Sequence, residues 1–199
     1  GWTATARMER DSIRVYPVND LLVDDRFLSA STTQLLHSGV DTNRTFFVDF
    51  VNTSRMNVNG DNFELVCKVN TSSDRPGVRC SQLQVFVFGE KSQHQLLLLK
   101  PGCEAWATLQ FSDFSRDGKK DDLSFLSADL SGGGTLTLRV VKKKVSFLIN
   151  EKEVYTARYN YPLENIYGVK ISFSGVGTIH DITLKDLVTG ASFQNAFTQ

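Results

Sequence analysis

Three tyrosines and one tryptophan are the candidate ligand-binding side chains of this sequence. Tyr155, Tyr159 and Tyr161 have the same parity along an extended stretch, so in a regular strand their rings point to one face. Trp106, shortly after Cys103, offers a second aromatic surface. Aromatic faces stack on sugar rings while hydroxyl groups bind the sugar edges. The alternative is that these rings pack in the core or at an edge, which is the commoner role of amphipathic rings.

Residues 113–121 have the spacing of the first half of a calcium loop. Asp113, Asp117 and Asp121 stand at the first, fifth and ninth positions, and Gly118 follows the second of them. The closing glutamate of such a loop is missing, because Ser124 occupies its position. Asp113, Asp117 and Asp121 are therefore the candidate calcium ligands. The alternative is a solvated turn whose acids are neutralised by neighbouring basic residues.

Groups for covalent or metal-dependent catalysis are not arranged in recognisable patterns. The three histidines are scattered without metal-ligand spacing, and there is no Gly-x-Ser-x-Gly sequence. Glu151 and Glu153 share a face but flank a turn signal, where charged side chains are usually solvated. The sequence favours binding over catalysis.

The three cysteines leave two alternatives open. Cys67 and Cys80 lie almost symmetrically about a turn signal at residues 72–77, where two antiparallel strands would bring them face to face. A disulfide between Cys67 and Cys80 would leave Cys103 unpaired. The other interpretation is that all three are ordinary buried thiols.

Composition and charge limit the classes of partner. Lys plus Arg and Asp plus Glu number 22 each in 199 residues, so the chain lacks the basic character of a nucleic-acid binder. The longest apolar run, residues 96–99, is far shorter than a membrane span. Gly1 resembles the residue left when a tag is removed, so we expect the natural chain to begin earlier, with room for a signal peptide or anchor.

Short strands dominate the hydrophobic pattern. Turn signals separate ten runs with strand character, which lie at residues 46–51, 63–69, 82–88, 95–100, 105–111, 135–141, 145–150, 153–159, 169–174 and 179–187. The run at 82–88 is apolar on both faces towards its end, which predicts a central strand. Helical periodicity is limited to residues 20–28 and 121–130. This pattern predicts an all-β antiparallel two-sheet sandwich.

The sandwich is expected to form one domain over residues 21–199. Residues 1–20 are predicted to be an extended lead-in, in which Ile13, Val15 and Tyr16 add an edge strand. Strand parity predicts a set of inward side chains: Phe63, Leu65, Leu83, Val85, Leu136, Leu138, Phe147, Ile149, Ile171 and Phe173.

The C-terminal third resembles a known family. Residues 134–141, residues 144–154 with the sequence KVSFLINEKEV, and residues 168–186 with the sequence GVKISFSGVGTIHDITLKD are similar to the closing strands of concanavalin A-like, or laminin G-like, jelly rolls. The likeness is strongest to extracytoplasmic domains of Bacteroidetes-type bacteria. Glu151 stands where the family commonly has glycine, but Asn150 suits a left-handed turn, and Gly175 and Gly177 suit a close backbone approach.

The resemblance implies a jelly-roll sandwich of two stacked sheets that often holds glycan. Glucanases of this fold carry three acids on one strand in the pattern Glu-x-Asp-x-x-Glu, which this chain lacks. We therefore expect a noncatalytic binding or sensing module outside the cytoplasm, in the periplasm or at the cell surface, with a glycan or a surface protein as partner. The alternatives are a glycoside hydrolase whose acids come from separate strands, and a structural interaction domain of a surface protein.

Overall fold

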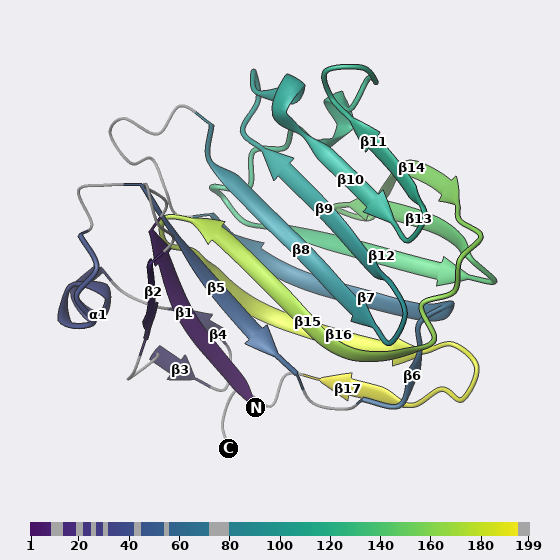
Figure 1. Cartoon of the computed structure of the whole chain (residues 1–199), viewed down its shortest axis with the longest axis horizontal. Coiled ribbons are helices and arrows are strands. Elements are labelled where there is room, and N and C mark those ends of the chain that lie inside the picture. The colour runs from purple at the N-terminus through teal and green to yellow at the C-terminus, as the bar shows by residue number, and fades with distance from the viewer. Residues whose placement is uncertain are drawn as a thin grey trace.

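Two antiparallel sheets face each other in the computed structural model, which describes residues 1–8, 14–18, 22–24, 27–29, 32–41, 45–53, 56–71 and 80–194 (Figure 1). Across sheet A the order is β11 (Phe114–Asp117), β10 (Thr108–Phe111), β9 (Gln93–Leu99), β8 (Gln82–Gly89), β15 (Asn165–Ser174), β5 (Phe46–Asn52), β1 (Trp2–Met8) and β2 (Arg14–Pro17), with β6 (Val58–Asn59) also paired to β15. Across sheet B it is β14 (Lys152–Arg158), β13 (Lys144–Ile149), β12 (Gly134–Val141), β7 (Asn62–Asn70), β16 (Thr178–Asp186), β4 (Phe27–Ser29) and β3 (Leu22–Asp24), with β17 (Ser192–Gln194) also paired to β16.

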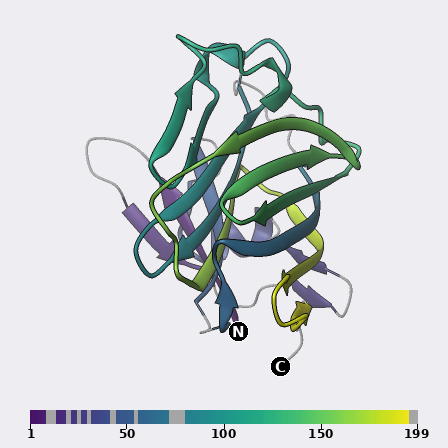
Figure 2. The same cartoon turned by 90° about the vertical axis from the view of Figure 1, so that its right-hand side faces the viewer.

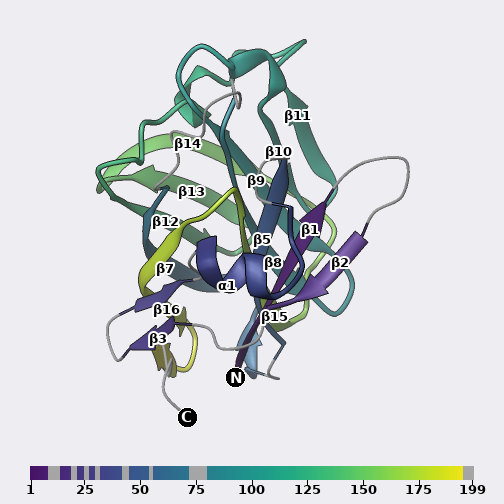
Figure 3. The same cartoon turned by 90° about the vertical axis from the view of Figure 1, so that its left-hand side faces the viewer.

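The chain crosses between the sheets several times, as in a jelly roll. Strand β7 of sheet B is followed by β8 of sheet A, β11 by β12, and β14 by β15. Figure 3 shows the two layers side by side, with helix α1 (Thr32–His37) in front of them. The edge hairpins β10–β11 and β13–β14 both lie on the side that faces the viewer in Figure 2. The predicted all-β antiparallel sandwich is confirmed.

The core fills the space between the sheets, and strand alternation selects its side chains. Nine of the ten residues predicted to point inward are at most 3% exposed. The tenth, Ile149, is partly buried and packs against the core at the end of β13. Central β8 buries side chains on both faces, including Phe86, as its doubly apolar pattern predicts.

The N-terminal segment differs from the prediction of a lead-in. Residues 2–8 form β1, which pairs with β5 along seven positions and buries Ala4 and Ala6 in the core. The expected edge strand is present as β2, which contains Val15 and Tyr16, whereas Ile13 lies outside the described residues. The buried residues of β1 are alanines that alternate with threonines, and these short side chains differ too little in hydrophobicity to produce a clear strand pattern in the sequence.

Neither predicted helix forms. Residues 22–24 and 27–29 are the paired strands β3 and β4, and residues 20, 21, 25 and 26 lie outside the described part. In the second segment only Ser124–Leu126 is helical, as the 3₁₀ turn η2. Asp122 and Asp129 each accept a hydrogen bond from the backbone N–H two residues later, a local bond that competes with a continuous helix. Among the described residues no helix is long and apolar enough to cross a membrane.

The disulfide joins Cys80 to Cys103, so the predicted pairing of Cys67 with Cys80 is wrong. The hairpin on which that prediction depended does not exist, because β7 and β8 belong to different sheets. Cys67 is a free thiol in the core. Cys103 meets Cys80 because β8 pairs with β9, whose end is extended by a hydrogen bond from the Lys100 N–H to the Ser81 carbonyl. The turn signal at residues 72–77 lies outside the described residues.

The turn between β13 and β14 has two residues with left-handed backbone. Asn150 has φ 49° and Glu151 has φ 67°, so the glutamate takes the conformation for which glycine is the usual choice. The Asn150 side chain accepts a hydrogen bond from the Thr135 N–H at 2.9 Å, which fastens the turn to β12. Of the two later glycines, Gly175 has φ 89°, and a Cβ at Gly177 would lie 2.1 Å from the Phe173 ring.

Candidate functional site

The outward side chains of sheet A stand in rows that cross the strands. The register aligns Gln84 of β8, Ser172 of β15, Asp49 of β5 and Thr5 of β1, and each alternates with core residues of its own strand. Two of these polar residues are shielded although they point away from the core, since Ser172 is 0% and Asp49 5% exposed. Gln84 and Thr5 are partly exposed. By contrast, the Lys68 side chain on the outer face of sheet B is 58% exposed.

Asp49 is the fixed centre of this face. Arg7 donates hydrogen bonds to it from Nε at 2.9 Å and from Nη2 at 3.5 Å, and the Ser172 hydroxyl donates to Oδ1 at 2.5 Å. The Arg7 guanidinium also lies 4.7 Å from the centroid of the Phe47 ring. Charge-assisted bonds of this kind hold the carboxylate in one geometry. Asp49 is therefore an ordered polar anchor in the middle of the face.

Three aromatic rings follow one another beside this polar row. Phe86 and Phe88 of β8 lie 5.8 Å apart with 14° between their planes, and Tyr167 of β15 lies 6.1 Å beyond Phe88 at 25°. We call these three residues the aromatic strip. A Cβ at Gly168 would stand 3.3 Å from the Phe88 ring, so the glycine gives that ring room above the backbone of β15. Tyr167 is 45% exposed, so the strip is open to solvent at one end.

Amide side chains are frequent on the part of this face formed by β8, β9 and β10. Five glutamines point outward from β8, β9 and β10, and all five are partly exposed: Gln82, Gln84, Gln93, Gln95 and Gln110. Gln84 donates to the Gln82 side chain at 3.2 Å, and Gln110 donates to the Ser112 carbonyl at 3.0 Å. Amides both donate and accept hydrogen bonds, so amides beside aromatic rings can bind the hydroxyls and the flat face of a sugar.

The structure separates the three tyrosines that parity placed on one face. Tyr155 is partly buried and stacks on Phe125 with ring centroids 4.6 Å apart. Tyr159 is 3% exposed and donates a hydrogen bond from its hydroxyl to Asp61 at 2.6 Å. Burial, with the hydrogen bond to Asp61, raises the pKa of Tyr159. Tyr161 is 50% exposed. The parity argument fails because β14 ends at Arg158, so Tyr159 and Tyr161 do not continue the strand.

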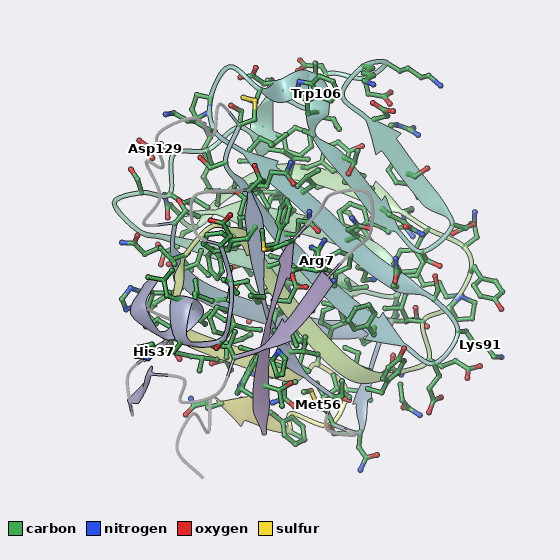
Figure 4. The ribbon with its side chains drawn as sticks, turned by 60° about the vertical axis from the view of Figure 1, so that its left-hand side comes forward. Arg7, His37, Met56, Lys91, Trp106 and Asp129 are labelled. Carbon is green, nitrogen blue, oxygen red and sulfur yellow. A yellow bond between two sulfur atoms is a disulfide. The ribbon has the colours of Figure 1, made fainter. Side chains whose placement is uncertain are left out.

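Trp106 lies in a 3₁₀ turn, η1 (Glu104–Trp106), and not in the predicted strand at residues 105–111, which begins only at Thr108. Its ring is 59% exposed, and the Lys119 ammonium lies 4.7 Å from the ring centroid. Figure 4 shows Trp106 at one end of the molecule, well away from Arg7 on the outer face of sheet A. Trp106 is thus an accessible aromatic surface separate from the aromatic strip.

The three candidate calcium ligands do not gather round one point. Asp113 stands in the turn directly before β11 and Asp117 is the last residue of that strand, which the sequence did not predict. The Asp113 carboxylate accepts hydrogen bonds from the backbone N–H groups of Asn160 and Tyr161, which lower its pKa. Asp121 accepts from the Asp117 N–H at 3.2 Å. In the part of the chain that the structure describes, no three His, Cys, Asp or Glu side chains are grouped to hold a metal ion.

Sequence reasoning passed over the residues that form this face. Phe86 and Phe88 are outward residues at the end of the run at 82–88, whose doubly apolar pattern predicts a central strand but not a row of aromatic rings on its outer face. The row of Gln84, Ser172 and Asp49 has no local signal, because the three residues come from strands that are far apart in the chain.

No protein-family model matches the sequence, and no curated protein matches it either. Solved structures with a similar fold include the exoplasmic/lumenal domain of VIP36 bound to Ca²⁺ and Man3GlcNAc, with 12% identity, TM-score 0.55 and coverage of 94% of this chain and 84% of that one. The Emp47p carbohydrate recognition domain has 10% identity and TM-score 0.53 over 92% and 87% of the two chains. A prokaryotic β-1,3-1,4-glucanase from a mouse hindgut metagenome has 10% identity and TM-score 0.52 over 94% and 92%.

These likenesses show the fold. The chain has the two-sheet antiparallel sandwich of concanavalin A-like lectins and glucanases. Lectins and glycoside hydrolases share this sandwich, so the fold alone favours neither activity.

Proposed function

We propose that this protein is a noncatalytic glycan-binding module and that the outer face of sheet A is its binding surface. The observation that carries the proposal is the aromatic strip Phe86–Phe88–Tyr167 beside a row of amides and the anchored Asp49. Stacking on the rings supplies apolar contact, and the amides supply oriented hydrogen bonds. The neighbouring folds include a carbohydrate recognition domain and a domain bound to Man3GlcNAc, which supports a glycan as the ligand class.

The carboxylates on this face favour binding over hydrolysis. Among the described strand residues that point outward on sheet A, the only carboxylates are Asp49 of β5 and Asp117 of β11. Five strand spacings of ~4.8 Å separate these strands, about 24 Å along the sheet. Hydrolysis of a glycosidic bond requires two carboxyl groups about 5 to 9.5 Å apart. The glycoside hydrolase therefore stands as the second candidate, supported by the glucanase neighbour.

The cellular setting that we propose is outside the cytoplasm, in the periplasm or at the cell surface of a Bacteroidetes-type bacterium. The disulfide between Cys80 and Cys103 supports an oxidising compartment. A larger surface protein is the alternative partner, in which case this chain acts as a structural interaction domain and binds no glycan.

A glycan array, probed with and without calcium, tests the proposal. The wild-type protein should bind at least one glycan, and Phe88→Ala should weaken that binding by about tenfold, because a central stacking ring is lost. Phe193→Ala is the matched control, since Phe193 is 41% exposed on β17 and belongs to sheet B.

Three results would contradict the proposal. Equal binding by Phe88→Ala and the wild type would remove the aromatic strip from the site. Release of reducing ends from the bound glycan, abolished by Asp49→Asn, would support the hydrolase. Binding to no glycan at all would leave the structural interaction domain.

A further inference from the structure

Lys170 of β15 is a half-buried ammonium on the outer face of sheet A. Its Nζ lies 4.0 Å from the centroid of the Phe86 ring, the first ring of the aromatic strip. Among the described residues it has no carboxylate within ion-pairing distance and makes no hydrogen bond through its side chain. In the described part of the chain, the Phe86 ring is thus the only close partner of this charge.

The nearest carboxylate on this face is already occupied. Asp49 stands diagonally from Lys170 on the neighbouring strand β5, and Arg7 and Ser172 bind its two oxygens. Burial lowers the pKa of Lys170, while the charge of Asp49 raises it and that of Arg7 lowers it. Arg7, Asp49 and Lys170 together carry two positive charges and one negative charge, so this part of the face has one positive charge in excess.

An ammonium withdrawn from water is normally paired with an anion or fully hydrogen-bonded. The ammonium has three N–H donors, and the face of one phenyl ring satisfies it from one side only. A ligand that stacks on the strip next to Phe86 would therefore bring its own substituents within reach of unused donors. The chemistry of those donors selects a negatively charged substituent.

We propose that the glycan bound by this face is acidic, and that a carboxylate or sulfate group of the sugar pairs with the Lys170 ammonium while the sugar ring stacks on the aromatic strip. This inference rests on the proposed function and names its ligand class. Arg7 is already paired with Asp49 and is not available to the ligand. Lys170 is therefore the charge that determines specificity.

Two matched pairs of ligands test the inference by calorimetric titration. One pair is an oligogalacturonate and its methyl ester, which differ in the carboxylate charge. The other is a sulfated galactan and the same galactan after desulfation. The wild-type protein should bind the charged member of at least one pair about tenfold or more tightly than the neutral member, and the pair that shows the preference tells carboxylate from sulfate.

Variants of Lys170 assign the preference to this side chain. Lys170→Met keeps the length of the side chain and should bind both members of the pair equally, whereas Lys170→Arg should retain the preference. Lys68→Met makes the same change of charge on the outer face of sheet B, where the side chain is 58% exposed, and should behave as wild type. Thermal unfolding of each variant checks that the fold is intact.

The outcomes separate this inference from the proposed function. If charged and neutral members bind equally and Phe88→Ala still weakens binding by about tenfold, the face binds glycan but Lys170 does not select acidic sugars. A preference that persists in Lys170→Met also overturns the inference, as does equally tight binding of polyglutamate, which would indicate an acidic peptide as ligand. If none of the four glycans binds although the array shows binding to another glycan, this inference fails and the proposed function stands. If the protein binds no glycan on the array, both fail.

Discussion

His94 is a polar side chain enclosed by rings in the core between the sheets. It is 1% exposed, and its ring lies 4.9 Å from Tyr159, 5.6 Å from Phe111 and 6.0 Å from Phe63, measured between centroids. Neither ring nitrogen has a hydrogen-bond partner among the residues that the structure describes. Burial lowers the pKa of His94 to about 3, because the charged imidazolium loses its hydration there.

His94 should make the protein less stable as the pH falls. Between about pH 6.5 and pH 3 the unfolded chain binds a proton at this residue and the folded chain does not, so the free energy of unfolding decreases through that window, by up to about 5 kcal/mol. His94→Leu should remove this pH dependence and raise the free energy of unfolding at pH 7 by about 1 kcal/mol, because an unsatisfied buried group is removed. Urea unfolding at pH 7, 5 and 4 measures both effects.

The control is His180→Gln, since His180 is exposed on β16. It should leave the pH dependence of unfolding as in the wild type. An identical slope of stability against pH in His94→Leu and the wild type would show that His94 is not the group that titrates.

The orientation of individual side chains was predictable from the sequence only where the local structure is regular. Parity placed Phe147 and Phe173 in the core correctly because both lie within long strands. The same rule failed for Tyr159 and Tyr161, which lie beyond the end of β14. Parity also says nothing about Lys170 and Asp49, whose proximity depends on the pairing of β15 with β5.

At the scale of elements, the disulfide ties the start of β8 to the turn that carries Trp106. Cys103 stands directly before η1, and Cys80 lies two residues before β8. The bridge closes 23 positions of sequence, so removing it with Cys80→Ser and Cys103→Ser should lower the free energy of unfolding by about 3 kcal/mol. Denaturant unfolding of the double variant measures this loss.

Peptide mass analysis without reduction gives a second readout of the same prediction. It should find Cys80 linked to Cys103 and Cys67 unmodified by an alkylating reagent in the native protein. Burial raises the pKa of Cys67 to about 12, so its reactive thiolate is scarce as well as inaccessible. A bridge that contains Cys67 would contradict the connection of β8 and β9 described here.

Most strands were predictable because their side chains alternate, and their order in the sheets was not. Alternation identifies β7 and β8 as strands, but the choice between a hairpin and a crossing to the other sheet depends on contacts far away in the chain. The wrong pairing of Cys67 with Cys80 follows from the assumption that β7 and β8 form a hairpin. Strand β11 was overlooked because Asp117 and Gly118 at its end match a calcium loop as well as a turn.

At the scale of the whole molecule, the sandwich brings three distant segments together to make one surface. Strand β8 supplies Phe86 and Phe88, β5 supplies Asp49, and β15 lies between them with Ser172 and Lys170. The fold class was predictable from strand spacing and from the resemblance of the last third of the chain. The surface was not, because it exists only after β15 has paired with both neighbours.

A titration of isotopically labelled protein with the glycan that binds best on the array, followed by amide chemical shifts, locates the binding surface. We expect the perturbed amides to cluster on β8, β9 and β15 of sheet A, with the largest changes around Phe86, Phe88 and Tyr167. Changes confined to the turn that carries Trp106, or to the outer face of sheet B, would contradict the assignment of the binding surface.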